Sequence, residues 1–232
     1  MAARALPGMQ RLYGADWITV DAAYADQLAT KVQLIARHEA DVIACLPCAR
    51  EAASELLSEV LVLLAERPDF HVADATVQRP DGTRVRVDQT KPLHTLSRLI
   101  QEDVCILQKQ GDVHVLTASL LCFPASWTLS EKIGRGLPAI HRPVAEYDAD
   151  VAKRVQRLFD GVRVGHPIWR ANLLRYQNAD LYQPHREGDP REIPEESARY
   201  ERSERQTLWR MPLSDAIVFS IHTTVSAVPD TA

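Results

Sequence analysis

The sequence predicts an α+β fold built around an antiparallel sheet with helices over one face. Three observations predict it. Helical periodicity dominates the first 70 residues, and strand-like alternation becomes frequent after residue 100. Two of the late strands, at residues 168–172 and 201–208, carry Trp, Arg, Asn, Glu and Gln at positions where a purely structural strand is apolar. Charged groups facing a core must be paired or hold a ligand, so we expect this sheet to form a pocket wall.

The N-terminal part is predicted to be mainly helical, at residues 24–36 and 49–66. Both stretches are rich in Ala, Leu and Glu, with apolar residues three and four positions apart. Pro68 ends the second stretch. Val-rich strands are expected within residues 70–87, on either side of the turn sequence Pro80-Asp81-Gly82.

The later part of the chain alternates strands and helices in a definite order. Residues 104–108 and 113–122 read as two strands, joined by a hairpin-like connection at 109–112. The remaining expected elements are helices at 130–133, 137–140 and 148–160, then strands near 167–176, 201–211 and 216–225.

The order of these elements is that of a PAS domain: two strands, several short helices, one longer helix and three strands. Such a domain is an antiparallel five-stranded sheet whose helices close a ligand pocket on one face. We therefore expect a PAS-like domain with a ligand pocket at residues 96–228. Residues 1–95 are expected to form an N-terminal helical region with a small β hairpin, packed on that main domain.

Composition excludes several classes of partner. The chain has 232 residues, 46% of them hydrophobic, which is enough for one substantial core. A net charge of -4 provides no basic field for nucleic acid. No stretch approaches the roughly 18 apolar residues of a membrane-spanning helix. The N-terminus lacks the apolar segment of a signal peptide. The expectation is a soluble, cytoplasmic protein.

The four cysteines are Cys45, Cys48, Cys105 and Cys122. The first two have the CxxC spacing of redox and metal sites. There is no second CxxC, and the pair falls in an Ala-rich region that reads as helix rather than directly after a strand. We interpret the cysteines as small buried hydrophobic residues. The role of the Cys45/Cys48 pair stays open.

Six short motifs occur in a fixed order along the main domain: QEDVCIL (101–107), LCFPASW (121–127), EKIGR (131–135), IHRPV (140–144), WRAN (169–172) and ERQTLWRMP (204–212). With these motifs the chain resembles the α subunit of the heme-dependent oxidative N-demethylases. The resemblance covers residues 95–225 well and the N-terminal helices more loosely. It implies a PAS fold that binds heme b and uses it in catalysis.

The resemblance also implies the reaction and its partners. A small secondary amine such as dimethylamine would be demethylated by O2 to the primary amine and formaldehyde, with electrons from NADPH through a flavin and iron–sulfur partner. The chain lacks a Gly-rich dinucleotide fingerprint and a ferredoxin-type cysteine series, so we expect a separate reductase subunit. The alternative is a non-catalytic PAS module that senses heme or another small ligand. The sequence is compatible with an oligomer and leaves the oligomeric state open.

Histidine is the commonest nitrogen ligand of heme iron, and His141 is the first candidate. It belongs to one of the motifs and lies between the short helices and the longer helix. The alternative is a surface or capping histidine before Pro143. His166, at the start of a strand, is the second candidate. His222 is in the last strand, where the resemblance leads us to expect Arg.

Heme propionates need cationic partners, for which Lys132, Arg135, Arg170 and Arg205 are the candidates. Lys132 and Arg135 have the alternative of a solvated helical face. Arg205 has the alternative of pairing with Glu102 or Glu204.

Glu102, Asn172 and Glu204 are the candidates for binding a cationic amine or relaying protons. The alternative for Glu102, with the adjacent Asp103, is a cap on the first strand. Trp127 and Trp169 are expected to serve mainly in packing, with attraction of an alkylammonium ion as the alternative.

Overall fold

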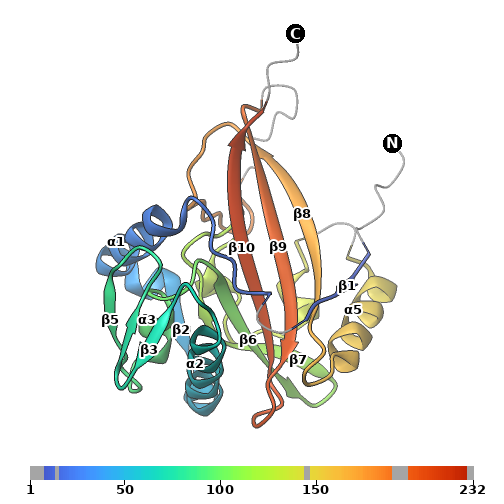
Figure 1. The fold of residues 1–232 in the computed structure, drawn as a ribbon. Helices are drawn as coiled ribbons and strands as arrows, with labels where there is room; N and C mark the ends of the chain where they lie inside the picture. The colour runs from blue at the N-terminus through green and yellow to red at the C-terminus, as the bar shows by residue number, and fades with distance from the viewer. Residues whose placement is uncertain (1–7, 14–15, 144–146, 190–197, 229–232) are drawn as a thin grey trace.

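The computed structural model describes residues 8–13, 16–143, 147–189 and 198–228 (Figure 1). The helices are α1 (Tyr24–Val42), α2 (Arg50–Ala65), α3 (Pro92–Leu96), α4 (Leu137–Ile140) and α5 (Ala149–Gly161), with 3-10 turns η1 (Pro47–Ala49) and η2 (Leu129–Glu131). The strands are β1 (Gln10–Arg11), β2 (Ile43–Cys45), β3 (His71–Ala73), β4 (Thr76–Gln78), β5 (Arg84–Arg86), β6 (Asp103–Gln110), β7 (Val113–Leu120), β8 (Ile168–Tyr176), β9 (Tyr200–Arg210) and β10 (Ile217–Ala227).

The main sheet has the strand order β1-β8-β9-β10-β6-β7-β2, and every pairing in it is antiparallel. A smaller sheet has the order β3-β4-β5. The α+β expectation is confirmed. The main sheet of the described residues has seven strands rather than the expected five, because β1 and β2 extend its two edges. Strands of two and three residues carry too little alternation to be recognised from sequence.

Both faces of the main sheet are covered. One face, here called the N-terminal face, carries Val104, Ile106 and Val218, which share a core with residues of α1, α2 and α3. The other, here called the α5 face, carries Leu107, Leu208 and Ile217, which share a core with η2, α4 and α5. In Figure 1, α1, α2, α3 and the small sheet lie on one side of the main sheet and α5 lies on the other.

The sequence accounts for the main helices. The apolar stripe predicted for α2 is fully buried at Leu56, Val60 and Leu64. Helix α5 begins after Asp148, whose carboxylate accepts hydrogen bonds from the amides of Asp150 and Val151, as an N-cap residue does. None of the helices in the described ranges has both the length and the apolar character needed to cross a membrane.

The turn at Pro80-Asp81-Gly82 is confirmed. It joins β4 to β5, with the Gly82 amide bonded to the Arg79 carbonyl at 2.9 Å. Gly82 has φ of 82°, a left-handed conformation that glycine adopts without steric cost.

The helical interpretation of the CxxC region is wrong at its first cysteine. Cys45 ends β2 and pairs with Ala118 of β7, and the helical turn begins only at Pro47. Cys45 and Cys48 are both exposed and free, so they are not the buried hydrophobic residues that were expected. That expectation is confirmed for Cys105 and Cys122, which are buried and free.

Candidate functional site

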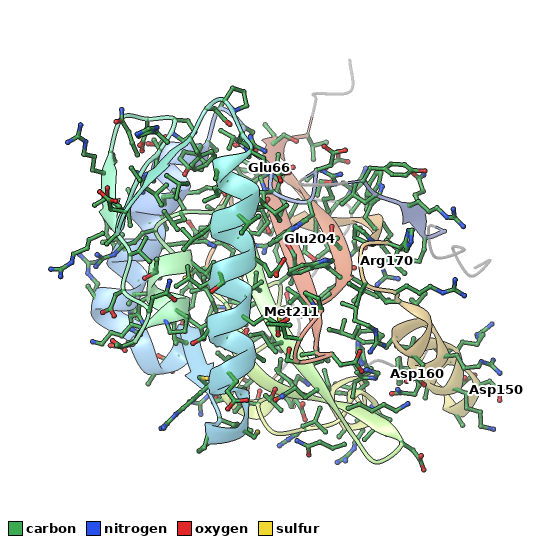
Figure 2. The ribbon with its side chains drawn as sticks, turned by 60° about the horizontal axis from the view of Figure 1, so that its bottom comes forward. Glu66, Asp150, Asp160, Arg170, Glu204 and Met211 are labelled. Carbon is green, nitrogen blue, oxygen red and sulfur yellow. The ribbon has the colours of Figure 1, made fainter. Side chains whose placement is uncertain are left out.

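Polar side chains cluster on the α5 face where β8 and β9 pair. The register places Arg170 opposite Gln206 and Asn172 opposite Glu204. Alternation along the strands puts all four on one face. Glu204 and Gln206 are buried, whereas Arg170 and Asn172 are half-buried. Figure 2 shows Glu204 and Arg170 on the strands that lie between α2 and α5. The polar side chains predicted in these two strands therefore lie on one face of the sheet.

A chain of hydrogen bonds connects these side chains. Arg202 donates from Nε to Glu204 Oε1 at 3.1 Å, and Gln206 donates from Nε2 to Glu204 Oε2 at 3.1 Å. Arg170 in turn donates from Nε to Gln206 Oε1 at 2.9 Å. The two Nη groups of Arg170 have no partner within the described part of the chain. Burial lowers the pKa of Arg170, and the Glu204 carboxylate opposes this shift. A half-buried arginine with unpartnered Nη groups favours the binding of an additional anion.

His141 follows α4 and is half-buried. Its Nδ1 is 2.9 Å from the Leu137 carbonyl, which can only accept, so Nδ1 carries the proton. Its ring stacks on Tyr147 with centroids 4.4 Å apart. Burial lowers the pKa of His141, and the nearby Lys132 and Arg170 add to the effect. The imidazole is therefore neutral at physiological pH. Among the described residues no partner contacts Nε2, whose lone pair is available to a metal.

Lys132 lies near His141, and Arg135 lies near the Glu187 carboxylate with which Lys132 pairs. Lys132 is buried rather than solvated, and its Nζ donates to the Ile140 carbonyl at 2.7 Å and to the Glu187 carboxylate. Arg135 Nη1 is 3.6 Å from the same carboxylate, which comes from the loop between β8 and β9. The hydrogen bond from Lys132 lowers the pKa of Glu187, with smaller contributions from Arg135 and Arg142. Three cations thus share one carboxylate.

The structure does not bring all the candidate residues together. Arg205 lies on the N-terminal face, with its guanidinium 4.9 Å from the Trp169 ring centroid and Nη1 3.5 Å from Thr19 Oγ1. Glu102 is fully buried, and its Oε1 accepts the Thr19 amide at 2.7 Å. Neither residue contacts the α5-face cluster. Across the described residues Arg205 forms no ion pair with Glu102 or Glu204. Glu204 lies on the opposite face of the sheet and is paired with Arg202.

The two other candidate ligand histidines differ in their surroundings. His166 is exposed in the turn before β8. His222 is buried on the N-terminal face, with Nε2 3.1 Å from Asp21 Oδ2 and Nδ1 3.2 Å from Glu102 Oε1. Nε2 is therefore hydrogen-bonded to a carboxylate, whereas Nδ1 is within ion-pair distance of Glu102 but makes no hydrogen bond among the described residues.

A separate hollow of about 300 Å³ lies between residues 121–129 and the β8–β9 loop. Trp127, Tyr182 and Asp41 are among its lining residues. Trp127 also packs against the core of the α5 face, as expected of a packing residue. Across the described ranges no group of three or more His, Cys, Asp or Glu side chains could hold a free metal ion.

Sequence reasoning missed Arg202 and Glu187. Arg202 had a usable signal, because it precedes Glu204 by two residues in the same strand and so shares its face. Glu187 had none, because it lies in a loop whose path the sequence does not specify.

Comparison with protein-family models matches residues 8–232 to the family described as haem-dependent oxidative N-demethylase, alpha subunit-like. The match includes the N-terminal region, which the sequence resemblance covered only loosely. The family indicated by the six motifs is confirmed.

Proposed function

The chain belongs to the haem-dependent oxidative N-demethylase, alpha subunit-like family, and from that premise we propose that it is a heme-dependent oxygenase component. Its substrate is a small secondary amine such as dimethylamine. O2, two electrons and two protons convert one N-methyl group to formaldehyde and leave the primary amine, while the second oxygen atom becomes water. The electrons come from NADPH through a separate flavin and iron–sulfur partner. The family description as an alpha subunit supports such a multi-subunit assembly.

The arrangement of the main sheet supports a PAS-like domain at residues 96–228. Strands β6 to β10 lie next to one another, and β1 and β2 only extend the edges. Segments η2, α4 and α5 cover one face, where a PAS domain has its pocket. Residues 1–95 then form the second region, packed on the opposite face.

The single observation that carries the proposal is the state of His141. A metal-bound histidine commonly donates its other ring N–H to a carbonyl, which fixes the ring and keeps the coordinating nitrogen unprotonated. His141 has this arrangement, with Nδ1 on the Leu137 carbonyl and Nε2 unpartnered among the described residues. The lowered pKa keeps it neutral, as ligation requires. This donor chemistry suits heme iron, which His141 would hold through Nε2.

The cations of the candidate site fit the two propionates. Arg170 offers two Nη groups without a protein partner in the described ranges, and Lys132 and Arg135 share a single carboxylate. These three residues would hold the propionates by charge-assisted hydrogen bonds. Arg205 was expected to do so as well. Its position on the opposite face supports a packing role against Trp169 instead.

Glu204 and Asn172 are the groups on the α5 face best suited to the amine. Each carboxylate oxygen of Glu204 accepts one hydrogen bond and retains capacity for a second, so it can accept an N–H of a dialkylammonium ion. Asn172 lies opposite Glu204 and offers an amide oxygen on the same face. Glu102 contacts Thr19 and His222 on the N-terminal face, which supports a structural role for it. Bound heme supplies O2 binding and activation.

A hemin titration followed by absorption tests the proposal. Wild-type protein should develop a Soret band with a stoichiometry of one. His141→Ala should lose or shift this band, whereas the matched control His166→Ala, at an exposed position, should leave it unchanged. Formaldehyde release is then measured with dimethylamine and a chemical or enzymatic reductant.

The possible outcomes separate the alternatives. Absence of any hemin binding by wild type contradicts the heme assignment. A Soret band that His141→Ala leaves unchanged keeps the heme and rejects this ligand. Heme binding without amine-dependent formaldehyde release favours a non-catalytic PAS module that senses heme or another ligand.

We also propose a cytoplasmic location. All four cysteines are free in the structure, including the exposed Cys45 and Cys48, and free exposed thiols are usual in a reducing compartment.

A further inference from the structure

Arg202 is the most completely buried cation on the α5 face, with 1% of its surface exposed. Its guanidinium donates to acceptors from four segments of the chain. These are Glu204 Oε1 at 3.1 Å, the Leu181 carbonyl at 2.9 Å, Thr223 Oγ1 at 3.4 Å and the Phe123 carbonyl. A guanidinium is planar and has a fixed set of donors, so these acceptors fix its orientation.

One of these acceptors is held in turn by a buried ion pair. The Phe123 amide donates to Asp103 Oδ2, and Asp103 Oδ1 is 3.0 Å from Lys31 Nζ of α1. The side chains of Lys31 and Asp103 are 0% and 1% exposed. The position of Arg202 is therefore determined by packing well outside the candidate site.

A series of hydrogen bonds connects Arg202 to Arg170 in the candidate site. Glu204 is bonded to Arg202 through one oxygen and to Gln206 through the other, and Gln206 accepts from Arg170. Removal of Arg202 would leave Glu204, which is 4% exposed, as a buried carboxylate without its ion-pair partner. Glu204 also interacts electrostatically with a second cation, Arg170. Arg170 would then turn its Nη groups toward Glu204, and they would no longer be available to a ligand.

We propose that Arg202 is a positioning residue of this site. It satisfies the charge of Glu204, so that Arg170 is held only through Gln206 and keeps both Nη groups directed at a carboxylate of the bound ligand. That this carboxylate is a heme propionate rests on the proposed function. The orientation of Arg170 by Arg202 does not.

The first test needs no ligand. In apoprotein labelled with 15N-arginine, the Arg170 Nε–H resonance, assigned by its loss in Arg170→Lys, should exchange slowly with solvent. Arg202→Gln should accelerate this exchange roughly tenfold or more, because the Nη groups turn to Glu204 and the Nε–H loses its acceptor, Gln206 Oε1. Arg202→Lys keeps the charge but not the planar guanidinium. In this variant the exchange rate of the Arg170 Nε–H should lie between those of wild type and Arg202→Gln.

The matched control is Arg175→Gln, which removes an exposed ion pair with Glu201, at 3.0 Å, from the same pair of strands. It should leave the Arg170 exchange rate unchanged. If Arg202→Gln does not fold, Arg202→Lys gives the same comparison. An Arg170 exchange rate equal to wild type in the Arg202 variants would overturn the proposal.

The second test is a double-mutant cycle on the rate of hemin dissociation. Arg202→Gln should accelerate dissociation roughly tenfold in the wild-type background and less than about twofold in the Arg170→Met background, because it acts through Arg170. Additive effects would show that Arg202 only stabilises the fold and would overturn the proposal. Failure of wild type to bind hemin would instead contradict the proposed function, and the exchange measurement would still decide the role of Arg202.

Discussion

His222 Nδ1 lies 3.2 Å from Glu102 Oε1, on the face of the sheet that the N-terminal helices cover. The second ring nitrogen is 3.1 Å from Asp21, which exchanges hydrogen bonds with Gln101. One imidazole therefore connects β10 to the segment before α1 and to the segment before β6. Its register partner on β9 is the cation Arg205.

The surroundings of His222 predict a pH-dependent contribution to stability. Burial by itself lowers its pKa, but Glu102 and Asp21 outweigh burial and the net pKa is raised above 6.5. A raised pKa in the folded state means that the stabilisation is complete below pH 6.5 and is lost as the pH rises through the folded value. His222→Gln should therefore cost roughly 2 kcal/mol near pH 6, and less above the folded pKa. Urea unfolding of wild type and variant from pH 5.5 to 9 measures the difference in their free energies of unfolding. A difference that does not change with pH would contradict the prediction.

Glu55 connects α2 to the turn between β9 and β10. Its two oxygens accept the amides of Leu213 and Ser214 at 2.6 and 2.8 Å. Glu55→Ala should lower the free energy of unfolding by roughly 2 kcal/mol, because both bonds are to a charged acceptor. The control Glu51→Ala, at an exposed position of the same helix, should stay within about 0.5 kcal/mol of wild type. Equal effects of the two substitutions in urea unfolding would argue against the role of this contact.

Trp17 stacks on Trp209 of β9 with ring centroids 5.7 Å apart, and both side chains are buried. Trp17→Ala should cost about 3–5 kcal/mol by leaving a cavity between the N-terminal segment and the sheet. Trp17→Phe should cost much less, because it keeps an aromatic ring and removes an indole N–H that has no partner within the described residues. Thermal unfolding and the near-UV circular dichroism of the Trp pair test both variants. A large loss with Phe would indicate that the indole N–H has a partner after all.

The four thiols should divide into two pairs in their reaction with a thiol-specific disulfide reagent. Cys45 and Cys48 are exposed, whereas Cys105 and Cys122 are buried, and burial raises the pKa of Cys105 to about 12. Two thiols should react in the native protein and the other two only after unfolding. Cys45→Ser and Cys48→Ser should each remove one fast thiol. Burial also raises the pKa of Cys45, so its rate should increase between pH 7 and 9. Four fast thiols in native protein would contradict this division.

The order and type of the larger elements were predictable because each carries a long periodic pattern. Helix α2 and strands β8 to β10 are examples, with apolar stripes or alternation over many residues. The face of each polar residue was not predictable. Arg170 and Arg205 were both predicted to face the pocket, but the register pairs Arg170 with Gln206 and Ala171 with Arg205, which places the two arginines on opposite faces. A shift of one residue reverses every side chain, and the sequence does not fix the register between distant strands.

The ion-pair partners were unpredictable for a related reason. The partner of Glu204 is Arg202, two residues away in sequence, rather than Arg205. The partner of Lys132 is Glu187, which reaches it from a loop. Such pairs depend on side-chain direction and loop path, both of which are decided by tertiary packing.

The position of β10 between β9 and β6 has a consequence for biosynthesis. Strand β6 leaves the ribosome long before its neighbour β10, which pairs with it through contacts such as Asp103 with Ile221. Until then, the apolar edge of the β6–β7 hairpin is open to other chains. Contacts between distant segments also slow folding. The nascent chain is therefore expected to need protection by chaperones until its last strand has been synthesised.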